Sequence, residues 1–223
     1  MADNSPTSPV DICNLSLTEL KVNPISALDE EGSAVAELCN RHYDIRRKAL
    51  LRSHIWNFAK TEATLNLASN GSSNSYTDVY PLVKTYLRLI SIGDVFVWGK
   101  NELYDIRSIS ISGTFKKCIV IDNSGTATLE ILYIRNVVSV TEFDPLFTLL
   151  FKLELANDIA PGLTLKPSIR QSILTGLADA RLQARSIDGQ ERPPVRIQNS
   201  RFLRARKSGS TSQVQGITTV FED

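Results

Sequence analysis

One stretch near the N-terminus constrains the fold more than any other, because it reads as a long amphipathic helix that runs into a cluster of aromatic residues. From Ser33 to Ser53, largely apolar side chains recur at three- and four-residue steps, which places them on one helical face: Val35, Leu38, Cys39, His42, Ile45, Ala49 and Leu50. At a rise of about 1.5 Å per residue, this helix is roughly 31 Å long, enough to span a small domain. The segment 54–58 that follows (HIWNF) is expected to fix the end of the helix against the core.

The other sides of this helix are basic. They carry five cations, namely Arg41, Arg46, Arg47, Lys48 and Arg52. The acidic run Asp29–Glu31 lies just upstream, where the positive end of the helix dipole favours carboxylates, and the cations fall toward the C-terminal half. The pattern therefore predicts one apolar face turned to the core and a basic remainder.

Length and composition fit a soluble globular protein. The chain has 223 residues, of which 42% are apolar and 22% are charged, so it can form one substantial core or one core with a large insertion. No basic, apolar leader opens the sequence and no window approaches the roughly 18 apolar residues of a membrane span, so we expect synthesis and folding in the cytosol. The widely spaced Cys13, Cys39 and Cys118 are expected to be buried free thiols rather than disulfides or metal ligands.

Three further helices are predicted. A short one covers about 10–21 and ends at Asn23–Pro24. A second covers 146–160, after an N-terminal aspartate and a first-turn proline, and is apolar almost all round, so it should be the most buried helix. A third covers roughly 165–187 and should end at Asp188–Gly189.

Between the two pairs of helices the apolar period changes from 3.6 to 2, which indicates strands. Alternation begins at Lys60, and the segment 69–75 (SNGSSNS) reads as a loop. Further strands are predicted at Lys84–Ile92, Val95–Trp98, Leu103–Ile111, Cys118–Asp122, Ala127–Ile134 and Val137–Thr141. The short turn-rich separators favour an antiparallel meander over strand–helix–strand units.

The predicted fold class is therefore α+β: a four-helix core with an antiparallel β insertion and an extended C-terminal arm. The helical bundle comprises residues 1–59 and 142–189, the β insertion domain residues 60–141, and the arm residues 190–223.

The arm is basic and interleaved with apolar residues. It has six cations against one acid between Glu191 and Lys207, and a proline pair at 193–194 that excludes helix and strand there. Fully extended, it could reach about 110 Å. Three interpretations are open: a solvated disordered tail, a nucleic-acid-binding segment whose cations neutralise phosphates, or a strap whose apolar residues dock on a partner. The regular interleaving favours the strap.

No catalytic or cofactor motif is present. The sequence lacks a phosphate-binding glycine loop, a dinucleotide fingerprint, a serine nucleophile elbow and a zinc-protease helix. His42 and His54 have no nearby cysteine pair, and His42 reads as a hydrogen-bonded core residue. We therefore expect a protein that is not an enzyme and uses no cofactor or metal.

Two blocks of sequence resemble a known family, the head-to-tail adaptor (tail tubular protein A) of short-tailed bacteriophages. Residues 12–59 are similar to its opening pattern, an I-x-x-L turn, an acidic loop and then A-x-x-x-N-x-x-Y-D-x-x-R-x-x-x-L-x-x-x-x-W-x-F. Residues 140–191 are similar to its F-D-P-x-F helix, its proline–glycine break and the helix after it. The blocks cover nearly half of the chain, in the right order around a β insertion.

The resemblance implies a structural protein of the virion, made in the host cytoplasm. Such adaptors have a helical bundle and a β domain, and they assemble as dodecameric rings beneath the portal. The ring joins the portal protein to the tail nozzle protein and leaves a channel for DNA ejection, in which genomic DNA is not read sequence-specifically. Heterologous packing of one subunit face on another generates such a ring when the rotation closes.

The resemblance also implies site residues. The C-terminal arm corresponds to the portal-docking element, with candidate contacts at Arg192, Val195, Arg196, Ile197, Arg201, Phe202, Leu203, Arg204, Arg206, Lys207, Val220 and Phe221. The basic side of the long helix is a candidate inter-subunit surface, formed by Arg41, Arg46, Arg47, Lys48 and Arg52. The alternative function is a nucleic-acid-binding module that uses the basic arm.

Overall fold

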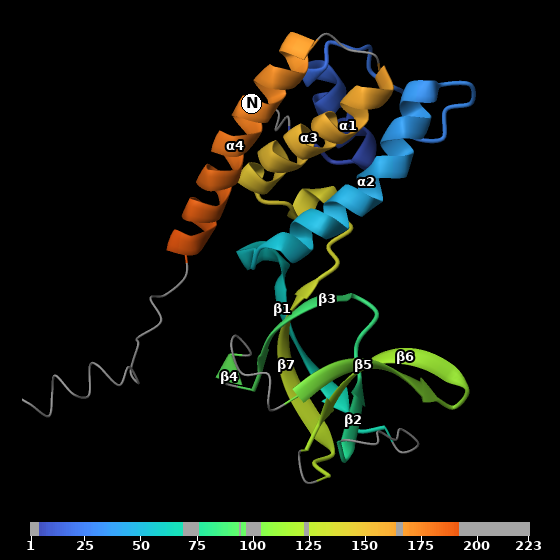
Figure 1. Ribbon diagram of the computed structural model, residues 1–223, viewed down its shortest axis with the longest axis vertical. Coiled ribbons are helices and arrows are strands. Elements are labelled where there is room, and N and C mark those ends of the chain that lie inside the picture. Colours follow the sequence, from blue (N-terminus) through green and yellow to red (C-terminus); the bar gives the residue numbers. More distant parts are fainter. Residues whose placement is uncertain are drawn as a thin grey trace, which may run out of the picture. The chain divides into compact units, whose positions relative to one another are not determined.

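A computed structural model of the protein describes residues 5–68, 76–93, 95–96, 104–122, 125–163 and 167–191. These residues form four α-helices and two small antiparallel sheets, which confirms the predicted α+β class (Figure 1). The helices are α1 (Pro9–Glu19), α2 (Ala34–Ser53), α3 (Pro145–Ile159) and α4 (Pro167–Gln190). Among the described helices, none combines the length and apolar character that a membrane span requires.

Side-chain caps set where three of the helices begin. At α1, the Ser8 hydroxyl accepts from the Asp11 amide (3.2 Å) and the Asp11 carboxylate accepts from the Ser8 amide (2.9 Å), a reciprocal capping box. Ser33 caps α2 by accepting from the amide of Ala36. Asp144 caps α3, as the sequence predicted, and Pro145 occupies its first turn.

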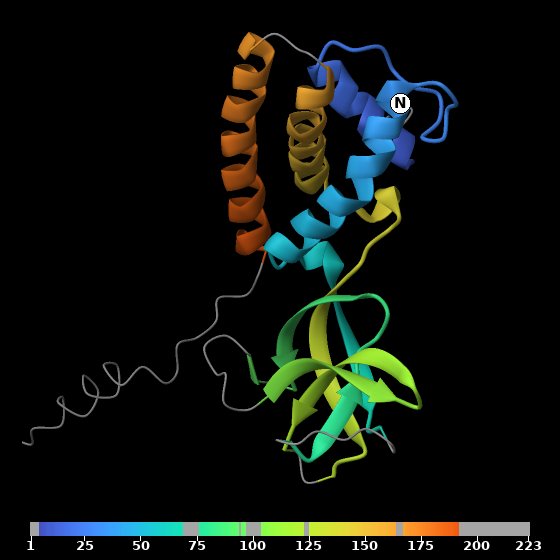
Figure 2. The ribbon, with the colours of Figure 1, turned by 45° about the vertical axis from the view of Figure 1, so that its right-hand side comes forward.

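Helix α3 is the centre of the helical core. It contacts each of the other three helices, which flank it in both views (Figures 1 and 2), and it has buried residues on all sides, as its sequence predicted. The segment after α2 also packs here as expected. The Trp56 ring lies edge-on to Phe147 with centroids 5.1 Å apart, and its indole N–H donates to the Leu50 carbonyl at 2.9 Å.

The buried face of α2 differs from the predicted one in its second half. Ile45 is 68% exposed, although its spacing placed it on the apolar face. The buried residues are instead Ala36, Cys39, Tyr43, Arg47, Leu50 and Leu51. Arg47 thus takes a core position, which a pattern of apolar residues cannot predict for a charged side chain.

The strands form two sheets, with orders β1-β7-β3-β4 and β2-β6-β5. Their bounds are β1 Lys60–Asn66, β2 Asp78–Pro81, β3 Tyr86–Ile92, β4 Val95–Phe96, β5 Tyr104–Ile111, β6 Thr114–Ile121 and β7 Thr128–Arg135. All pairings are antiparallel, as predicted. The predicted meander holds only for the hairpins β3–β4 and β5–β6, because β1 pairs with the distant β7 and β2 pairs with β6.

Several predicted elements were wrong in extent or missed, among them β6, which begins at Thr114 and not at Cys118. Val137–Thr141 is not a strand: Val137 is buried in the helical core and a short 3-10 helix covers Val140–Glu142. Helix α4 does not end at Asp188–Gly189 but continues to Gln190. Strand β2 was not predicted as a strand, and the loop predicted at 69–75 lies outside the described residues.

Buried apolar residues fall into separate clusters. The largest is formed by the helices together with Ile90, Ile134 and Val137 from the base of the β insertion. Two smaller clusters lie within the strands and include Leu65, Tyr80 and Ile119 in one, and Val79, Cys118 and Val120 in the other. The β insertion therefore has buried residues of its own.

Candidate assembly surfaces

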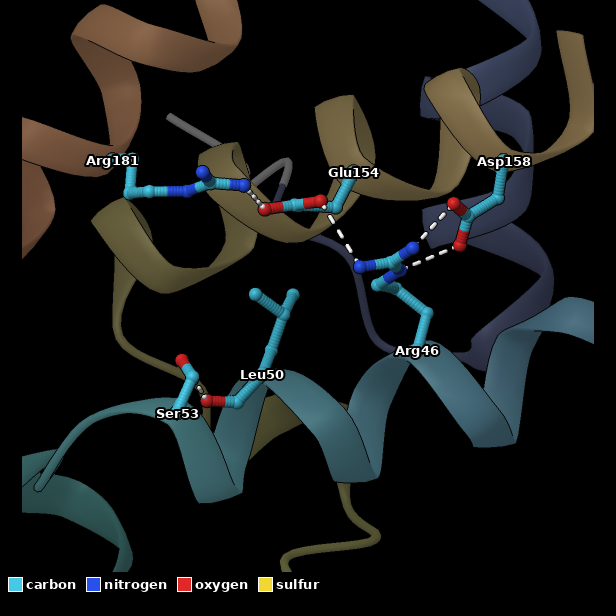
Figure 3. A network of polar contacts seen from close by, with 6 residues as sticks. All are labelled: Arg46, Leu50, Ser53, Glu154, Asp158 and Arg181. Atoms are coloured by element: carbon cyan, nitrogen blue, oxygen red, sulfur yellow. Dashed lines mark hydrogen bonds and ion pairs between the residues drawn. The ribbon is translucent and has the colours of Figure 1, made fainter.

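A buried carboxylate joins three helices of the core (Figure 3). Glu154 on α3 is 3% exposed and accepts from Arg46 on α2, Nη1 to Oε2 at 3.2 Å, and from Arg181 on α4. Arg46 also forms a bidentate pair with Asp158, one turn further along α3, with Nε to Oδ2 at 2.5 Å. The hydrogen bond with Asp158 raises the pKa of Arg46. Arg46 thus holds α2 to α3 instead of lying free on a basic face.

Arg47 is buried too, with 2% of its side chain exposed. Its guanidinium donates to the Val137 carbonyl, to Asn136 Oδ1 (2.8 Å) and to Asp44 Oδ1 (3.0 Å). Burial alone would raise the pKa of Asp44, but the contact with Arg47, aided by Lys48, outweighs it and lowers that pKa. The prediction that Arg47 belongs to an inter-subunit surface is therefore wrong, because its side chain is buried inside the core of its own chain.

Three of the five predicted cations do lie on the outside of α2. Arg41 is exposed and paired with Glu37 (2.6 Å), Lys48 is exposed and lies 3.6 Å from Asp44, and Arg52 is exposed. With Ile45, they recur at steps of four, three and four residues, so they share one side of the helix. We call Arg41, Ile45, Lys48 and Arg52 the α2 outer surface; its role as an inter-subunit contact stays a prediction.

The last turn of α4 is fixed to the segment after α2. Asp188 Oδ1 accepts from the Asn57 amide (2.7 Å), Asp188 Oδ2 lies 2.9 Å from His54 Nε2, and the Asp188 carbonyl accepts from the Asn57 side chain (2.6 Å). Glu191 is the last residue that the structure describes. The predicted arm contacts themselves, from Arg192 to Phe221, lie outside the described residues.

Sequence reasoning missed one exposed feature of the β insertion. The turn between β5 and β6 presents Phe115 with 78% of its surface exposed, followed by the exposed Lys116 and Lys117. A detectable signal was present: the pair Ser112–Gly113 is typical of a hairpin turn, and an aromatic residue next to two lysines on a short strand is seldom needed for packing.

The described residues offer no metal centre and no disulfide. They contain no group of three or more His, Cys, Asp or Glu side chains that could hold an ion. Cys13, Cys39 and Cys118 are buried free thiols, as predicted, and a hydrogen bond with Cys39 raises the pKa of Cys13. A pocket of about 370 Å³ is lined by Glu19, Lys21, Leu153, Ser168, Ile169, Ser172, Ile173 and Gly176. This lining combines apolar residues with two serines, a lysine and Glu19, whose carboxylate pairs with Lys152 at 2.7 Å.

Comparison with protein-family models and with curated proteins found no match for this sequence.

Proposed function

We propose that this chain is a structural virion protein: a head-to-tail adaptor whose copies form a dodecameric ring between the portal and the tail nozzle, lining part of the DNA ejection channel. The main support for this proposal is that the two adaptor-like blocks, residues 12–59 and 140–191, lie together in the structure. They are separated by the whole β insertion in sequence, yet they pack into one core, through the Trp56–Phe147 ring contact and the Arg46–Asp158 ion pair.

The positions of the adaptor-like pattern support this proposal because they coincide with the interactions that build the core. Its Y-D-x-x-R element reads onto Tyr43, Asp44 and Arg47; Tyr43 and Arg47 are buried, and Asp44 accepts a hydrogen bond from Arg47. Leu51 and Trp56 of the same pattern are buried, and so are Phe143 and Phe147 of F-D-P-x-F, in which Asp144 caps α3. Phe58 is half-buried and Asn40 is exposed. Most of the pattern positions thus take part in the helical core, which supports a structural role.

The same assignment leaves identifiable surfaces for partners. The α2 outer surface is available for a neighbouring subunit, the β insertion for the nozzle protein or a neighbour, and the arm for the portal. Genomic DNA would pass through the lumen without sequence-specific contacts, no cofactor is required, and the protein would be found at the head–tail junction of the virion.

The deciding experiment is native mass spectrometry of the purified protein, alone and mixed with portal, with and without residues 191–223. We expect the full chain to join the portal in a twelve-to-twelve complex and the truncated chain to fail. A triple variant F202S/L203S/F221S should lose portal binding, whereas the matched arm variant S208A/S210A/S212A should keep it.

Failure to bind portal with or without the arm would refute the proposal. The alternative, a nucleic-acid-binding module using Arg192–Lys207, makes a distinct prediction. It would bind duplex DNA with an affinity that falls steeply with salt, and it would retain most of that affinity in F202S/L203S/F221S.

A further inference from the structure

The β5–β6 hairpin is regular up to its tip. Its residues pair one to one from Tyr104 opposite Ile121 to Ile111 opposite Thr114, without a bulge. The two turn residues, Ser112 and Gly113, have φ values of 52° and 78°, the positive pair that a tight two-residue hairpin turn requires. The tip is thus part of a continuous ladder and presents its side chains in a defined orientation.

The distal half of β6 is an open sheet edge. Strand β2 pairs with β6 only from Cys118 to Ile121, and the amide of Leu82 donates to the Lys117 carbonyl at 2.9 Å just beyond. Backbone groups of alternate residues point to the same side of a strand, so those of Phe115 point the same way as this carbonyl, away from β5. On that side, the described part of the chain places no strand next to Phe115.

The side chains of this edge are apolar and cationic. Phe115 is 78% exposed, the highest value for any large apolar residue described, and Lys116 and Lys117 are exposed beside it. The Lys117 ammonium lies 5.2 Å from the centroid of the Tyr86 ring, which holds it on the same face as Phe115. No carboxylate occurs in β6, and Asp105, the one acid in β5, is paired with Arg107 at 2.6 Å.

A protective role accounts for only part of this arrangement. Lysines on an edge strand discourage unwanted strand pairing, and this explains Lys116 and Lys117. It does not explain Phe115, because an exposed aromatic on the same edge increases the tendency to pair. The combination is that of an edge which accepts one kind of strand and rejects others.

We propose that the β6 edge at Thr114–Lys117 binds an extended acidic segment of a partner protein by β-strand addition. The partner backbone pairs with the free N–H and C=O of Phe115, an apolar partner side chain covers the Phe115 ring, and partner carboxylates meet Lys116 and Lys117. A protein strand fits better than a nucleic acid, because the edge offers donors and acceptors, whereas a phosphate backbone supplies acceptors only. The inference does not depend on the adaptor proposal.

The test uses the full chain and a blocked, fluorescein-labelled peptide of repeating Val-Val-Glu-Glu, in which valine and glutamate alternate along each face of the strand, followed by fluorescence anisotropy. We expect saturable binding, with amide exchange at Phe115 slowed by the peptide. F115P, which removes the outward N–H and the ring, should weaken binding at least about tenfold, the loss expected for one interaction of ordinary strength. K116E/K117E should weaken it by at least a similar factor, and added salt should then strengthen the residual binding instead of weakening it, because like charges face each other.

The matched control is S110P. Ser110 lies opposite Phe115 in the ladder, and its backbone groups point to the outer edge of β5, so this proline should leave peptide binding unchanged. F115S keeps the backbone donor and tests the ring separately if F115P disturbs the fold; it should weaken binding several-fold.

Three outcomes would overturn the inference. The first is no binding of the valine–glutamate peptide, and the second is equal binding of a valine–lysine counterpart. The third is binding of a thymidine oligonucleotide but not of the peptide, which would make this edge a nucleic-acid surface instead.

Discussion

Arg47, in the middle of α2, donates a hydrogen bond from its buried guanidinium to the backbone carbonyl of Val137, 90 residues further along the chain. The carbonyl belongs to the segment that leads from β7 back into the helical core, and Asn136 supplies a second acceptor at 2.8 Å. One side chain thus satisfies polar groups at the point where the chain returns from the β insertion. Arg47 therefore acts inside the molecule, although its sequence neighbourhood suggested a surface cation.

Replacing Arg47 tests this role. R47A leaves the Val137 carbonyl and the Asn136 side chain buried without their donor, and it should lower the free energy of unfolding by about 3 kcal/mol. R41A is the matched control, because Arg41 lies on the exterior of the same helix, and it should change stability by less than about 0.5 kcal/mol. Urea unfolding followed by circular dichroism measures both. Equal effects of the two substitutions would contradict the buried role.

The Glu154 site predicts that Glu154 has a larger coupling free energy with Arg46 than with Arg181. A double-mutant cycle of Glu154→Gln with Arg46→Gln should give a coupling of about 1–2 kcal/mol, because both side chains are largely buried. The cycle with Arg181→Gln should give less than about 1 kcal/mol, since Arg181 is 45% exposed and water screens the pair. Chemical denaturation of the four variants of each cycle supplies the values. A larger coupling free energy between Glu154 and Arg181 would show that burial does not determine the relative strength of these two ion pairs.

The capping box of α1 predicts a pH dependence. The hydrogen bond from the Thr7 backbone amide, followed by the contact with Ser8, holds the pKa of Asp11 below its ordinary value of 3.8. A carboxyl with a lowered folded-state pKa adds stability above its unfolded-state pKa, and the contribution disappears as the pH falls through the folded-state pKa. D11N should therefore flatten the stability profile below about pH 4 relative to the wild type. Thermal melts from pH 2 to 7 check this.

The variants S8A and D11N separate the effect of the Asp11 charge from that of the Ser8 helix cap. S8A should cost about 1 kcal/mol at pH 7 through loss of the helix cap, while retaining the acid dependence that comes from the Thr7 contact. A D11N profile parallel to that of the wild type would show that Asp11 does not contribute to acid sensitivity.

The end of α4 should open when Asp188 is removed. D188A deletes the acceptor for the Asn57 amide and the partner of His54, so amides in the last turn of α4 should exchange faster, corresponding to a local loss of about 1–2 kcal/mol. Exposed Asp179, near the middle of the same helix, provides the control D179A, which should leave the last turn unchanged. Hydrogen exchange with mass spectrometry resolves the two. Unaltered exchange in D188A would show that other contacts hold this end.

The β5–β6 turn contains a correctable strain. Ser112 has a φ of 52°, a region that residues with a Cβ rarely adopt, and no steric demand visible in the turn requires a serine there. S112G should stabilise the protein by about 0.5–1 kcal/mol, and S112N should do so to a smaller extent. A melting temperature that falls in both variants would indicate that the Ser112 hydroxyl has a role of its own.

Much of the fold followed from local pattern. The long helix, the Asp144–Pro145 start of α3 and the change of apolar period at Lys60 all depend on residues close in sequence, and each was confirmed. Most strands followed from the apolar alternation, and their antiparallel pairing from the short separators, although β2 was missed and Val137–Thr141 is not a strand. The pairing of β1 with β7 did not, because no local feature specifies which distant strand completes a ladder.

The surfaces were harder to predict than the fold. Arg47 looks like its neighbours Arg46 and Lys48, and only the position of Val137 in space makes it a core residue. Asp188 reads as a helix terminator, yet its carboxylate bonds to Asn57 and the helix continues past it. Val137 has the side chain of a strand residue but lies in the helical core. Each error arose where a long-range polar or apolar contact outweighed local propensity.

The pairing of the first and last strands of the β insertion has a further consequence for how the chain folds. Lys60 lies opposite Ile134, so the insertion leaves and re-enters the helical core at neighbouring points. Once this ladder forms, the two helical halves are joined by an effectively short connection, and the entropy of closing the long loop no longer opposes their meeting. Formation of the helical core then does not depend on which residues make up the insertion beyond its base. The rest of the insertion can therefore be replaced in evolution, which changes the binding partners of the protein while the residues that pack the helices together stay the same.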